Sequence, residues 1–391
     1  MAYQHTEIAV VGGGMVGAAA ALGLAREGFE VTVIEQYEPP HFDAASLPDV
    51  RISALSSGSV ALLSELDVWP AVRAMRCHPY NQLETWEWET AHVGFSAAEL
   101  KLPVLGYMVE NHVLQRALWE AMAAHPQITL RCPATLSSMT QNAQERTLHF
   151  ADGEQLNVSL VIGADGANSR IRQWAGIGVD GWEYPQSCML ISVRCAEAPG
   201  GSTWQQFTPA GPRAFLPLFG EYASLVWYDS PQRIKALSQL SMPRLADEIA
   251  RHFPARLGDV EPLACGAFPL VRRHAQRYYG SGVVLIGDAA HTIHPLAGQG
   301  VNLGYRDVAE LIDVLARARK AEEQWASDVV LQRYQRRRRG DNLMMQSAMD
   351  LFYGTFSNSL APLRVARNLG LMAAGRAGGL KRAALKYALG L

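Results

Sequence analysis

The sequence has few cysteines, almost no net charge and no tract of biased composition. Its 391 residues carry a net charge of −2 and are 49% hydrophobic and 18% charged, which excludes a disordered chain and a globally basic nucleic-acid binder. The five cysteines are widely spaced and form no Cys-x-x-Cys pair. They predict neither a disulfide framework nor a zinc site, so we expect reduced thiols in a cytoplasmic protein without a bound metal.

The longest run without a charged residue spans residues 8–25, and its hydropathy is compatible with a membrane span or a signal sequence. Two features argue against both interpretations. The run contains five glycines, and Glu7 stands where a signal peptide needs basic residues. We therefore interpret the run as the start of a folded domain, in a chain long enough for two domains.

This run contains a glycine fingerprint of the form G-x-G-x-x-G. Gly12, Gly14 and Gly17 follow an apolar strand at 8–11 and open a helix of small residues. This context predicts a tight turn, close approach of the backbone to a pyrophosphate, and close packing of the helix on the strand. A second apolar strand, 31–34, ends in Glu35, near the spacing expected for a carboxylate that binds a ribose hydroxyl. The sequence therefore predicts a dinucleotide site.

Two later motifs also follow apolar strands. Asp165 and Gly166 come after a strand at 160–162, and their spacing D-G-x-x-S-x-x-R resembles the second signature of flavoprotein aromatic hydroxylases. An ordinary strand-to-helix turn with a capping serine is the alternative interpretation. Farther along, a strand at 283–286 leads to Gly287 and Asp288, and we expect this aspartate to accept hydrogen bonds from the ribityl chain of a flavin.

A glycine-flanked helix start follows the second of these motifs. Gly298, Gln299 and Gly300 precede a helix whose apolar residues recur at helical spacing from 301 to 315. The start of that helix would direct free backbone N–H groups and a positive dipole end at the flavin ring. Asn302, in its first turn, is assigned to the same cofactor site.

Together the three motifs resemble those of the FAD-dependent single-component hydroxylases built on the para-hydroxybenzoate hydroxylase plan. Within them the chain is most similar to the ubiquinone-biosynthesis hydroxylases, through the segments MRCHPY at 75–80, LETWEWET at 83–90, STWQQF at 202–207 and LKYALGL at 385–391. The resemblance implies bound FAD, NAD(P)H as transient reductant and O2 as co-substrate. It also implies a C4a-hydroperoxyflavin that hydroxylates a polyprenylated benzoquinol, 2-octaprenyl-3-methyl-6-methoxy-1,4-benzoquinol.

The resemblance also implies roles for single residues. Arg51 should contact the FAD phosphates or the isoalloxazine edge, Gln115 should face the FAD, and Pro295 should lie near the flavin ring at the mouth of the substrate pocket. A base that removes the phenolic proton would make the quinol a better nucleophile, and His291 and His294 are candidates for it or for a proton relay. The alternative is that these histidines hold the loop by hydrogen bonds.

The expected fold class is α/β, with a Rossmann-like FAD-binding domain interleaved with a mixed β-sheet substrate domain. We assign residues 1–75, 106–184 and 275–330 to the first, residues 76–105 and 185–274 to the second, and 331–391 to a C-terminal helical region. Aromatic and β-branched strands at 187–195, 213–219 and 223–229 indicate the mixed sheet, while a helix at 111–123 and a strand at 128–131 return to the FAD domain.

The C-terminal region is basic. Arg333 and residues 336–339 form one cluster, and residues 361–391 contain six basic residues and no acidic one. A basic amphipathic helix pair would contact an anionic membrane peripherally or dock on an assembly of ubiquinone-biosynthesis enzymes, and a solvated basic face is the alternative. Two alternatives for function also stay open: a hydroxylase of a soluble small aromatic compound, and a catalytically silent FAD-containing scaffold subunit.

Overall fold

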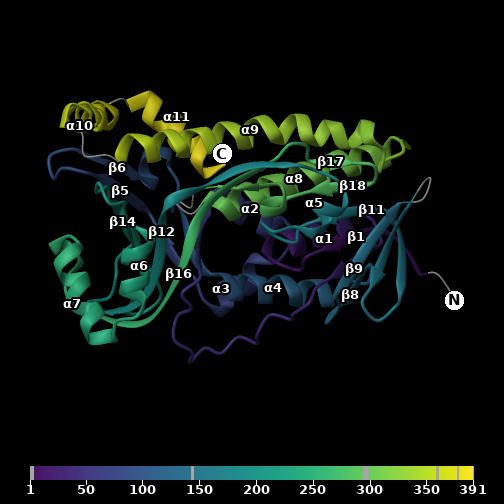
Figure 1. The fold of residues 1–391 in the computed structure, drawn as a ribbon, viewed down its shortest axis with the longest axis horizontal. Helices are drawn as coiled ribbons and strands as arrows, with labels where there is room; N and C mark the ends of the chain where they lie inside the picture. The colour runs from purple at the N-terminus through teal and green to yellow at the C-terminus, as the bar shows by residue number, and fades with distance from the viewer. Residues whose placement is uncertain (1–3, 142–144, 294–298, 358–360, 377, 391) are drawn as a thin grey trace.

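The structure, a computed structural model, describes residues 4–141, 145–293, 299–357, 361–376 and 378–390. Two sheet-based units lie side by side, and a long helix, α9 (Asp328–Phe356), runs over both of them (Figure 1). The N-terminal strand belongs to one unit, whereas the last two helices lie over the other.

The first unit contains a mainly parallel sheet, called here the nucleotide sheet, with the strand order β17-β18-β11-β1-β2-β8. Its strands are β1 (Gln4–Val11), β2 (Val31–Ile34), β8 (Ile128–Arg131), β11 (Gln155–Gly163), β17 (Tyr279–Gly280) and β18 (Val283–Leu285). The parts of the central strands nearest the carboxyl end of the sheet are mainly apolar because both faces of a parallel sheet are buried. A hairpin of β9 (Leu136–Gln141) and β10 (Arg146–Phe150) pairs antiparallel with β11.

Helix α1 (Met15–Arg26) packs against both α4 (Asn111–Ala123) and α8 (Gln299–Lys320). The uncharged run at 8–25 therefore forms β1 and α1, and nearly all of its side chains from position 18 onward are buried in the core of this unit. Its apolar composition is explained by burial in that core. In the part of the chain that the structure describes, no helix has the length and hydropathy to cross a membrane.

The second unit contains a large mixed sheet with the strand order β19-β16-β12-β15-β14-β13-β5-β6. Its strands are β5 (Gln82–Trp86), β6 (His92–Ser96), β12 (Val179–Cys195), β13 (Ser202–Gln206), β14 (Arg213–Pro217), β15 (Tyr222–Asp229), β16 (Val260–Ala275) and β19 (His291–Thr292). The pairing is antiparallel except between β13 and β5. Helices α6 (Pro231–Ser238) and α7 (Met242–His252) pack their apolar residues on one face of this sheet.

Two long strands join the units. The expected domain boundaries at 184/185 and 274/275 fall within β12 and at the end of β16, whose pairing continues from Val179 opposite Ala275 to Cys195 opposite Val260. Strand β19, which follows the Gly287-Asp288 motif, pairs with β16 through His274 opposite His291. The large mixed sheet therefore extends directly to the predicted cofactor loop.

The segment of chain between β2 and α4 also forms a third, smaller sheet of three strands. It consists of β3 (Ile52–Ser56), β7 (Gly106–Glu110) and β4 (His78–Tyr80), in the order β3-β7-β4. Helices α2 (Ser57–Glu65) and α3 (Trp69–Met75) come between β3 and β4 in the sequence. The first strand of the segment 76–105 thus belongs to this smaller sheet. Arg76 forms a buried two-bond ion pair with Glu110, at 2.7 and 2.9 Å, which fixes the junction.

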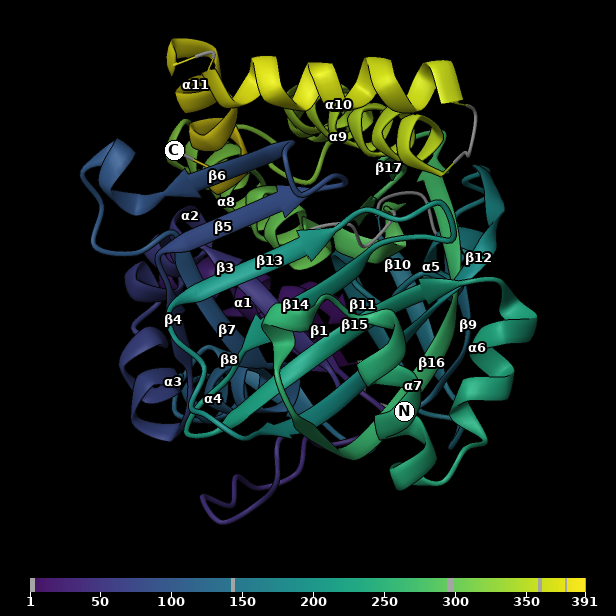
Figure 2. The same cartoon turned by 90° about the vertical axis from the view of Figure 1, so that its left-hand side faces the viewer.

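Helices α10 (Ala361–Arg376) and α11 (Gly378–Leu389) lie over β5 and β6 at the edge of the large mixed sheet (Figure 2). The expectation of a basic surface is wrong for two arginines of the C-terminal region. Arg338 is buried and pairs with Asp307, and Arg367 is buried and pairs with Glu87. Each arginine neutralises a buried carboxylate, which costs much free energy to leave unpaired.

Candidate cofactor and substrate site

The glycine loop between β1 and α1 has no room for side chains at two of its positions. A Cβ atom on Gly12, whose φ is +106°, would lie 2.4 Å from the Ala164 carbonyl oxygen, and one on Gly17 would lie 2.0 Å from the Gly12 oxygen. Gly14 faces open space and begins α1 without a side-chain cap or an acidic residue in the first turn. The free N–H groups of this helix start can bind an anion.

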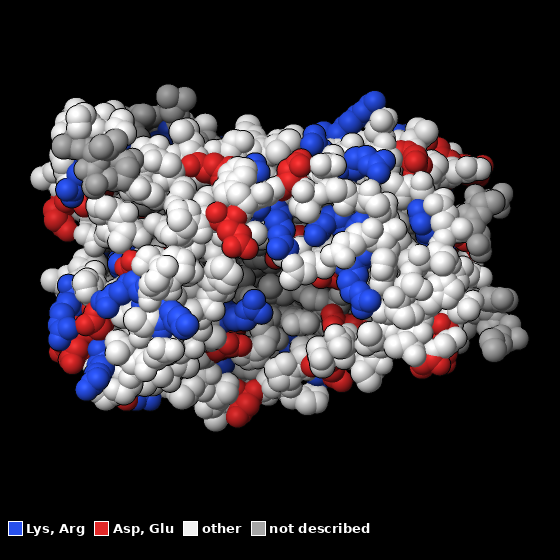
Figure 3. Space-filling view, in the orientation of Figure 1, with Lys and Arg blue, Asp and Glu red and all other residues white. Residues whose placement is uncertain are grey.

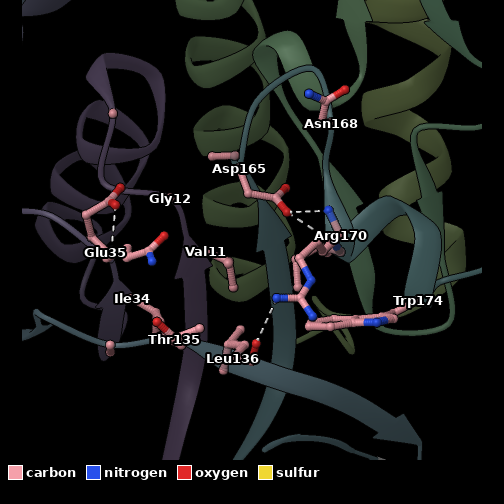
Figure 4. A pocket seen from close by; sticks show the side chains of 15 residues that line it. Val11, Gly12, Ile34, Glu35, Thr135, Leu136, Asp165, Asn168, Arg170 and Trp174 are labelled. Atoms are coloured by element: carbon pink, nitrogen blue, oxygen red, sulfur yellow. Dashed lines mark hydrogen bonds between the residues drawn. The ribbon is translucent and has the colours of Figure 1, made fainter. Parts of the chain in front are cut away.

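A cleft of about 400 Å³ opens beside this loop (Figure 4). It lies outside the carboxyl ends of three neighbouring parallel strands, β1, β2 and β11, where α/β sheets bind their ligands. Arg170 and Trp174 form one wall, with the guanidinium 4.8 Å from the indole centroid. These two residues were not predicted, because no spacing pattern in the sequence connects them with the glycine loop.

Two of the three carboxylates predicted for the cofactor, Glu35 after β2 and Asp165 after β11, face this cleft from different sides (Figure 4). The Glu35 carboxylate accepts hydrogen bonds from the backbone N–H groups of Gly13, at 2.7 Å, and of Gln36 and Tyr37. Asp165 accepts from the Ser169 hydroxyl and from two N–H groups of α5 (Arg170–Trp174). The second motif therefore also caps the start of α5, as expected for the strand-to-helix turn with a capping serine that was its alternative interpretation.

Side chains of α4 hold the glycine loop from behind. Gln115 donates from Nε2 to the Gly13 carbonyl oxygen at 3.0 Å, and Trp119 donates from Nε1 to the same oxygen at 2.7 Å. Gln115 thus contacts the loop that would bind the dinucleotide. Trp119 was not predicted, although it lies one turn farther along the same helix.

The Gly287-Asp288 motif places an ionisable side chain in a hollow. Asp288 is exposed to solvent, yet protein atoms surround it closely enough that burial raises the pKa of its carboxyl, against the opposing charges of His291 and Arg51. No described residue donates a hydrogen bond to this carboxylate, and Arg51 is likewise exposed without a described partner for its guanidinium. Both side chains are free to bind a ligand.

Helix α8 connects the cofactor loop with β3. Gln299 and Gly300 are its first residues, and Asn302 donates from Nδ2 to the Ala54 oxygen and accepts at Oδ1 from the Ser56 N–H. Asn302 thus holds β3 against the start of α8. The predicted residues His294, Pro295 and Gly298 lie outside the described residues.

His291 belongs to a buried polar network. Its Nε2 lies 2.5 Å from a carboxylate oxygen of Asp307, which also accepts from the Gly287 N–H, Arg338 and Asn342. Burial disfavours ionisation of Asp307, but the charges of His291 and Arg338 outweigh it and hold its pKa well below the usual range. These contacts favour the loop-holding role for His291. Asp307 was missed because its partners are distant in sequence.

A second pocket, of about 190 Å³, is apolar and lies between the large mixed sheet and the three-stranded sheet. Its walls include β3, β13, β14 and β15, and α11 closes one side through Leu385, Ala388 and Leu389. No Asp, Glu, Lys, Arg or His is among the described residues that line it. Burial raises the pKa values of Tyr80, Cys188 and Tyr228, so these three are protonated at neutral pH.

The apolar pocket is linked to the helix that follows the third motif through one strand. Ile52, Ala54 and Ser56 of β3 line the apolar pocket, and the same strand is bonded to Asn302 at the start of α8. A glycine loop that can bind phosphate at the carboxyl ends of a parallel sheet, together with a separate apolar pocket under a mixed sheet, is the arrangement expected of an FAD-dependent monooxygenase. The three motifs fit FAD, because the loop has an open glycine, an uncapped helix start and free ionisable side chains.

A family model described as FAD binding domain matches residues 5–347, and the chain belongs to this family. It is 68% identical to 3-demethoxyubiquinol 3-hydroxylase of Escherichia coli (strain K12), over 100% of both chains. It is 34% identical to ubiquinone hydroxylase UbiL of Rhodospirillum rubrum, over 98% of this chain and 89% of that one. These findings confirm the expected FAD cofactor, enzyme class and family resemblance.

The fold is shared with solved structures. The structure of p-nitrophenol 4-monooxygenase PnpA from Pseudomonas putida DLL-E4 superposes with a TM-score of 0.81, at 21% identity, over 98% of this chain and 97% of that one. This likeness confirms the predicted α/β fold class with C-terminal helices.

The buried His274 predicts a pH dependence of stability. Burial, with the nearby His291, lowers its pKa from 6.5 to about 4. Below pH 6.5 the unfolded chain therefore binds a proton at this position that the folded chain excludes, and stability falls as the pH falls towards 4. In urea unfolding, we expect His274→Gln to reduce the loss of unfolding free energy between pH 7 and pH 5 by about 2 kcal/mol. The exposed His41→Gln is the control, and equal pH dependence in both variants would contradict the assignment.

Proposed function

We propose that the protein hydroxylates the ring of a polyprenylated benzoquinol, as the name of its 3-demethoxyubiquinol 3-hydroxylase relative indicates for that protein. The expected substrate, 2-octaprenyl-3-methyl-6-methoxy-1,4-benzoquinol, has a single methoxy group, as a demethoxyubiquinol does. The observation that carries the proposal is the apolar pocket, whose described lining has no charged side chain and includes β3, the strand bonded to Asn302 of α8. Such a lining suits a neutral quinol with a hydrocarbon tail.

The cofactor contacts are proposed from the geometry of the three motifs. Gly12, Gly14 and Gly17 with the start of α1 would bind the pyrophosphate, and Glu35 a ribose hydroxyl. Asp165 and Gly166 would border the same cleft. When bound, FAD supplies the activation of O2 after reduction by NAD(P)H.

The flavin end involves the third motif. Asp288 would anchor the ribityl chain, and Arg51 would contact the phosphates or the ring edge. Gly287, Gln299, Gly300 and Asn302, with Gly298, would form the loop and helix start that face the ring, and Pro295 would border the pocket. We assign no base to the described pocket lining, since its ionisable groups are protonated at neutral pH. The protein would bind the quinol neutral, orient it and exclude water.

The alternatives make different use of the same pocket. Soluble aromatic substrates are commonly anionic, and the described lining has no cation to bind one. A catalytically silent scaffold would need neither the free carboxylate of Asp288 nor an apolar pocket at the cofactor. The geometry therefore favours the quinol hydroxylase.

Removing the flavin anchor should separate an enzyme from a scaffold. Asp288→Ala removes a carboxylate that would accept charge-assisted hydrogen bonds, and we expect FAD affinity to fall at least tenfold and hydroxylation with it. Flavin absorbance of the purified protein and a fluorescence titration with FAD measure this. The exposed Asp247→Ala is the matched control. Full product formation by Asp288→Ala would contradict the site assignment.

The substrate is tested by the quinones of cells that lack this gene. Mass spectrometry should show accumulated 2-octaprenyl-3-methyl-6-methoxy-1,4-benzoquinol, which the wild-type copy removes and the Asp288→Ala copy does not. An unchanged quinone pool would indicate a different aromatic substrate. Rescue by a folded variant without FAD would support the scaffold.

We also propose that α10 contacts a membrane surface through an apolar face. Its polar residues Arg364, Arg367 and Asn368 bond to Glu87 beneath the helix, whereas Val365 and Leu369 are 47% and 58% exposed on the opposite side. Among the described residues at the upper left of Figure 3, where α10 lies, uncharged atoms predominate. Exposed Arg382 and Lys386 on α11 would meet anionic headgroups.

This membrane contact predicts binding to lipid vesicles. We expect the wild-type protein to float with vesicles that contain anionic phospholipid, and Val365→Glu with Leu369→Glu to reduce the bound fraction severalfold, because charge replaces buried apolar area. Val329→Glu, at an exposed apolar position on α9, is the control. Equal flotation of all three proteins would contradict the proposal. If the wild-type protein does not float, the apolar face of α10 would instead be assigned to contact with a protein partner.

A further inference from the structure

The polar side chains in the apolar pocket fall into two groups. Thr203 donates its hydroxyl hydrogen to the Phe215 oxygen at 2.7 Å, and the Ser56 hydroxyl bonds to that of Ser59 at 3.2 Å. By contrast, the amide of Gln205 and the hydroxyl of Tyr80 line the pocket and make no hydrogen bond to the described residues. These two side chains therefore keep their hydrogen-bonding groups available in the pocket.

Strand alternation directs Gln205 into the pocket. Successive side chains of β13 point to opposite faces of the sheet, and Trp204 stacks on Phe215 on the other face. In the sheet register, Gln205 lies between Thr85 of β5 and Ala214 of β14. The small Ala214 also lines the pocket and leaves room beside the amide.

The neighbouring Thr85 adds a second observation. Its hydroxyl oxygen is completely buried and has no hydrogen-bond partner in the described part of the chain. Alternation along β5 places Thr85 on the same face as Leu83, which lines the pocket. Adjacent polar groups without partners cost free energy unless a ligand supplies the missing hydrogen bonds.

The chemistry of a quinol matches these groups. A primary amide offers both donors and an acceptor, and a phenolic hydroxyl is a donor and an acceptor as well. An amide does not titrate, so it can hold the ring without removing its proton. Hydrogen bonds at defined points of the pocket wall would also restrict which ring carbon faces β3.

We propose that Gln205 orients the quinol ring by a hydrogen bond to one of its hydroxyl groups, with Tyr80 as a second polar contact. The inference rests on the proposed function, because it takes a benzoquinol as the ligand. In the coupled reaction, the two electrons of NAD(P)H and O2 convert a ring C–H into C–OH, and the second oxygen atom leaves as water. When the ring is misplaced, the same two electrons and two protons convert O2 into hydrogen peroxide.

The test compares identical substitutions at adjacent positions. Gln205→Leu removes the amide at similar size, and Gln206→Leu makes the same change on the opposite face of β13. With NAD(P)H and a demethoxyubiquinol that has a short prenyl tail, we expect Gln205→Leu to raise KM about tenfold, the effect of one lost hydrogen bond. Product formed per NAD(P)H should fall, and hydrogen peroxide should rise by the same amount. FAD content should stay unchanged.

The outcomes separate this inference from the proposed function. Wild-type enzyme that hydroxylates the quinol while Gln205→Leu couples as well as Gln206→Leu would overturn the role of Gln205 alone. Wild-type enzyme that hydroxylates no polyprenylated benzoquinol would overturn the proposed function. If Gln205→Leu fails to retain FAD, the ratio of product to hydrogen peroxide is measured instead for Gln205→Met and for Tyr80→Phe. The second of these variants removes only a hydroxyl group.

Discussion

The hydrogen bonds and ion pairs of the buried Asp307 carboxylate are the interactions on which the rest of the structure depends. It is completely buried, so its charge needs close hydrogen bonds and ion pairs. The backbone N–H of Gly287, the ring of His291 and the side chains of Arg338 and Asn342 supply them. Because these groups come from the loop after β18, from β19 and from α9, one residue of α8 joins segments of both units.

This network determines where the proposed ligand-binding groups of the third motif lie. Asp288 directly follows the residue that Asp307 holds, and Arg172 of the second motif donates to the Ala289 oxygen beyond it. At the start of α8, Asn302 fixes β3, a wall of the apolar pocket. The third motif and the apolar pocket are therefore positioned by the same helix. A monooxygenase needs this fixed spacing, since oxygen transfer depends on the orientation of the ring.

Local patterns were sufficient to predict much of this fold. The helix at 111–123, the strand at 128–131 and the glycine loop were predicted correctly, because each depends on neighbours within a few residues. Asp307 could not be found in this way, since Arg338 is 31 residues away and Asn342 35 residues away. The same limit explains why Arg338 and Arg367 resembled surface charges. Gln205 acquires its position from strand register, which a single sequence does not specify.

The arrangement of α10 is difficult to explain by stability alone. A buried ion pair contributes little net free energy compared with apolar residues of similar size, because desolvation offsets its attraction. Yet Arg367 and Asn368 bond to Glu87 beneath the helix while Leu363 and Leu369 face outwards. Turning the helix over would bury the leucines but would leave the buried carboxylate of Glu87 unpaired, which costs free energy. The pairing with Glu87 therefore explains the inner face of α10, whereas the exposed leucines of the outer face are what the proposed membrane contact would use; α11, the next helix, closes one side of the apolar pocket.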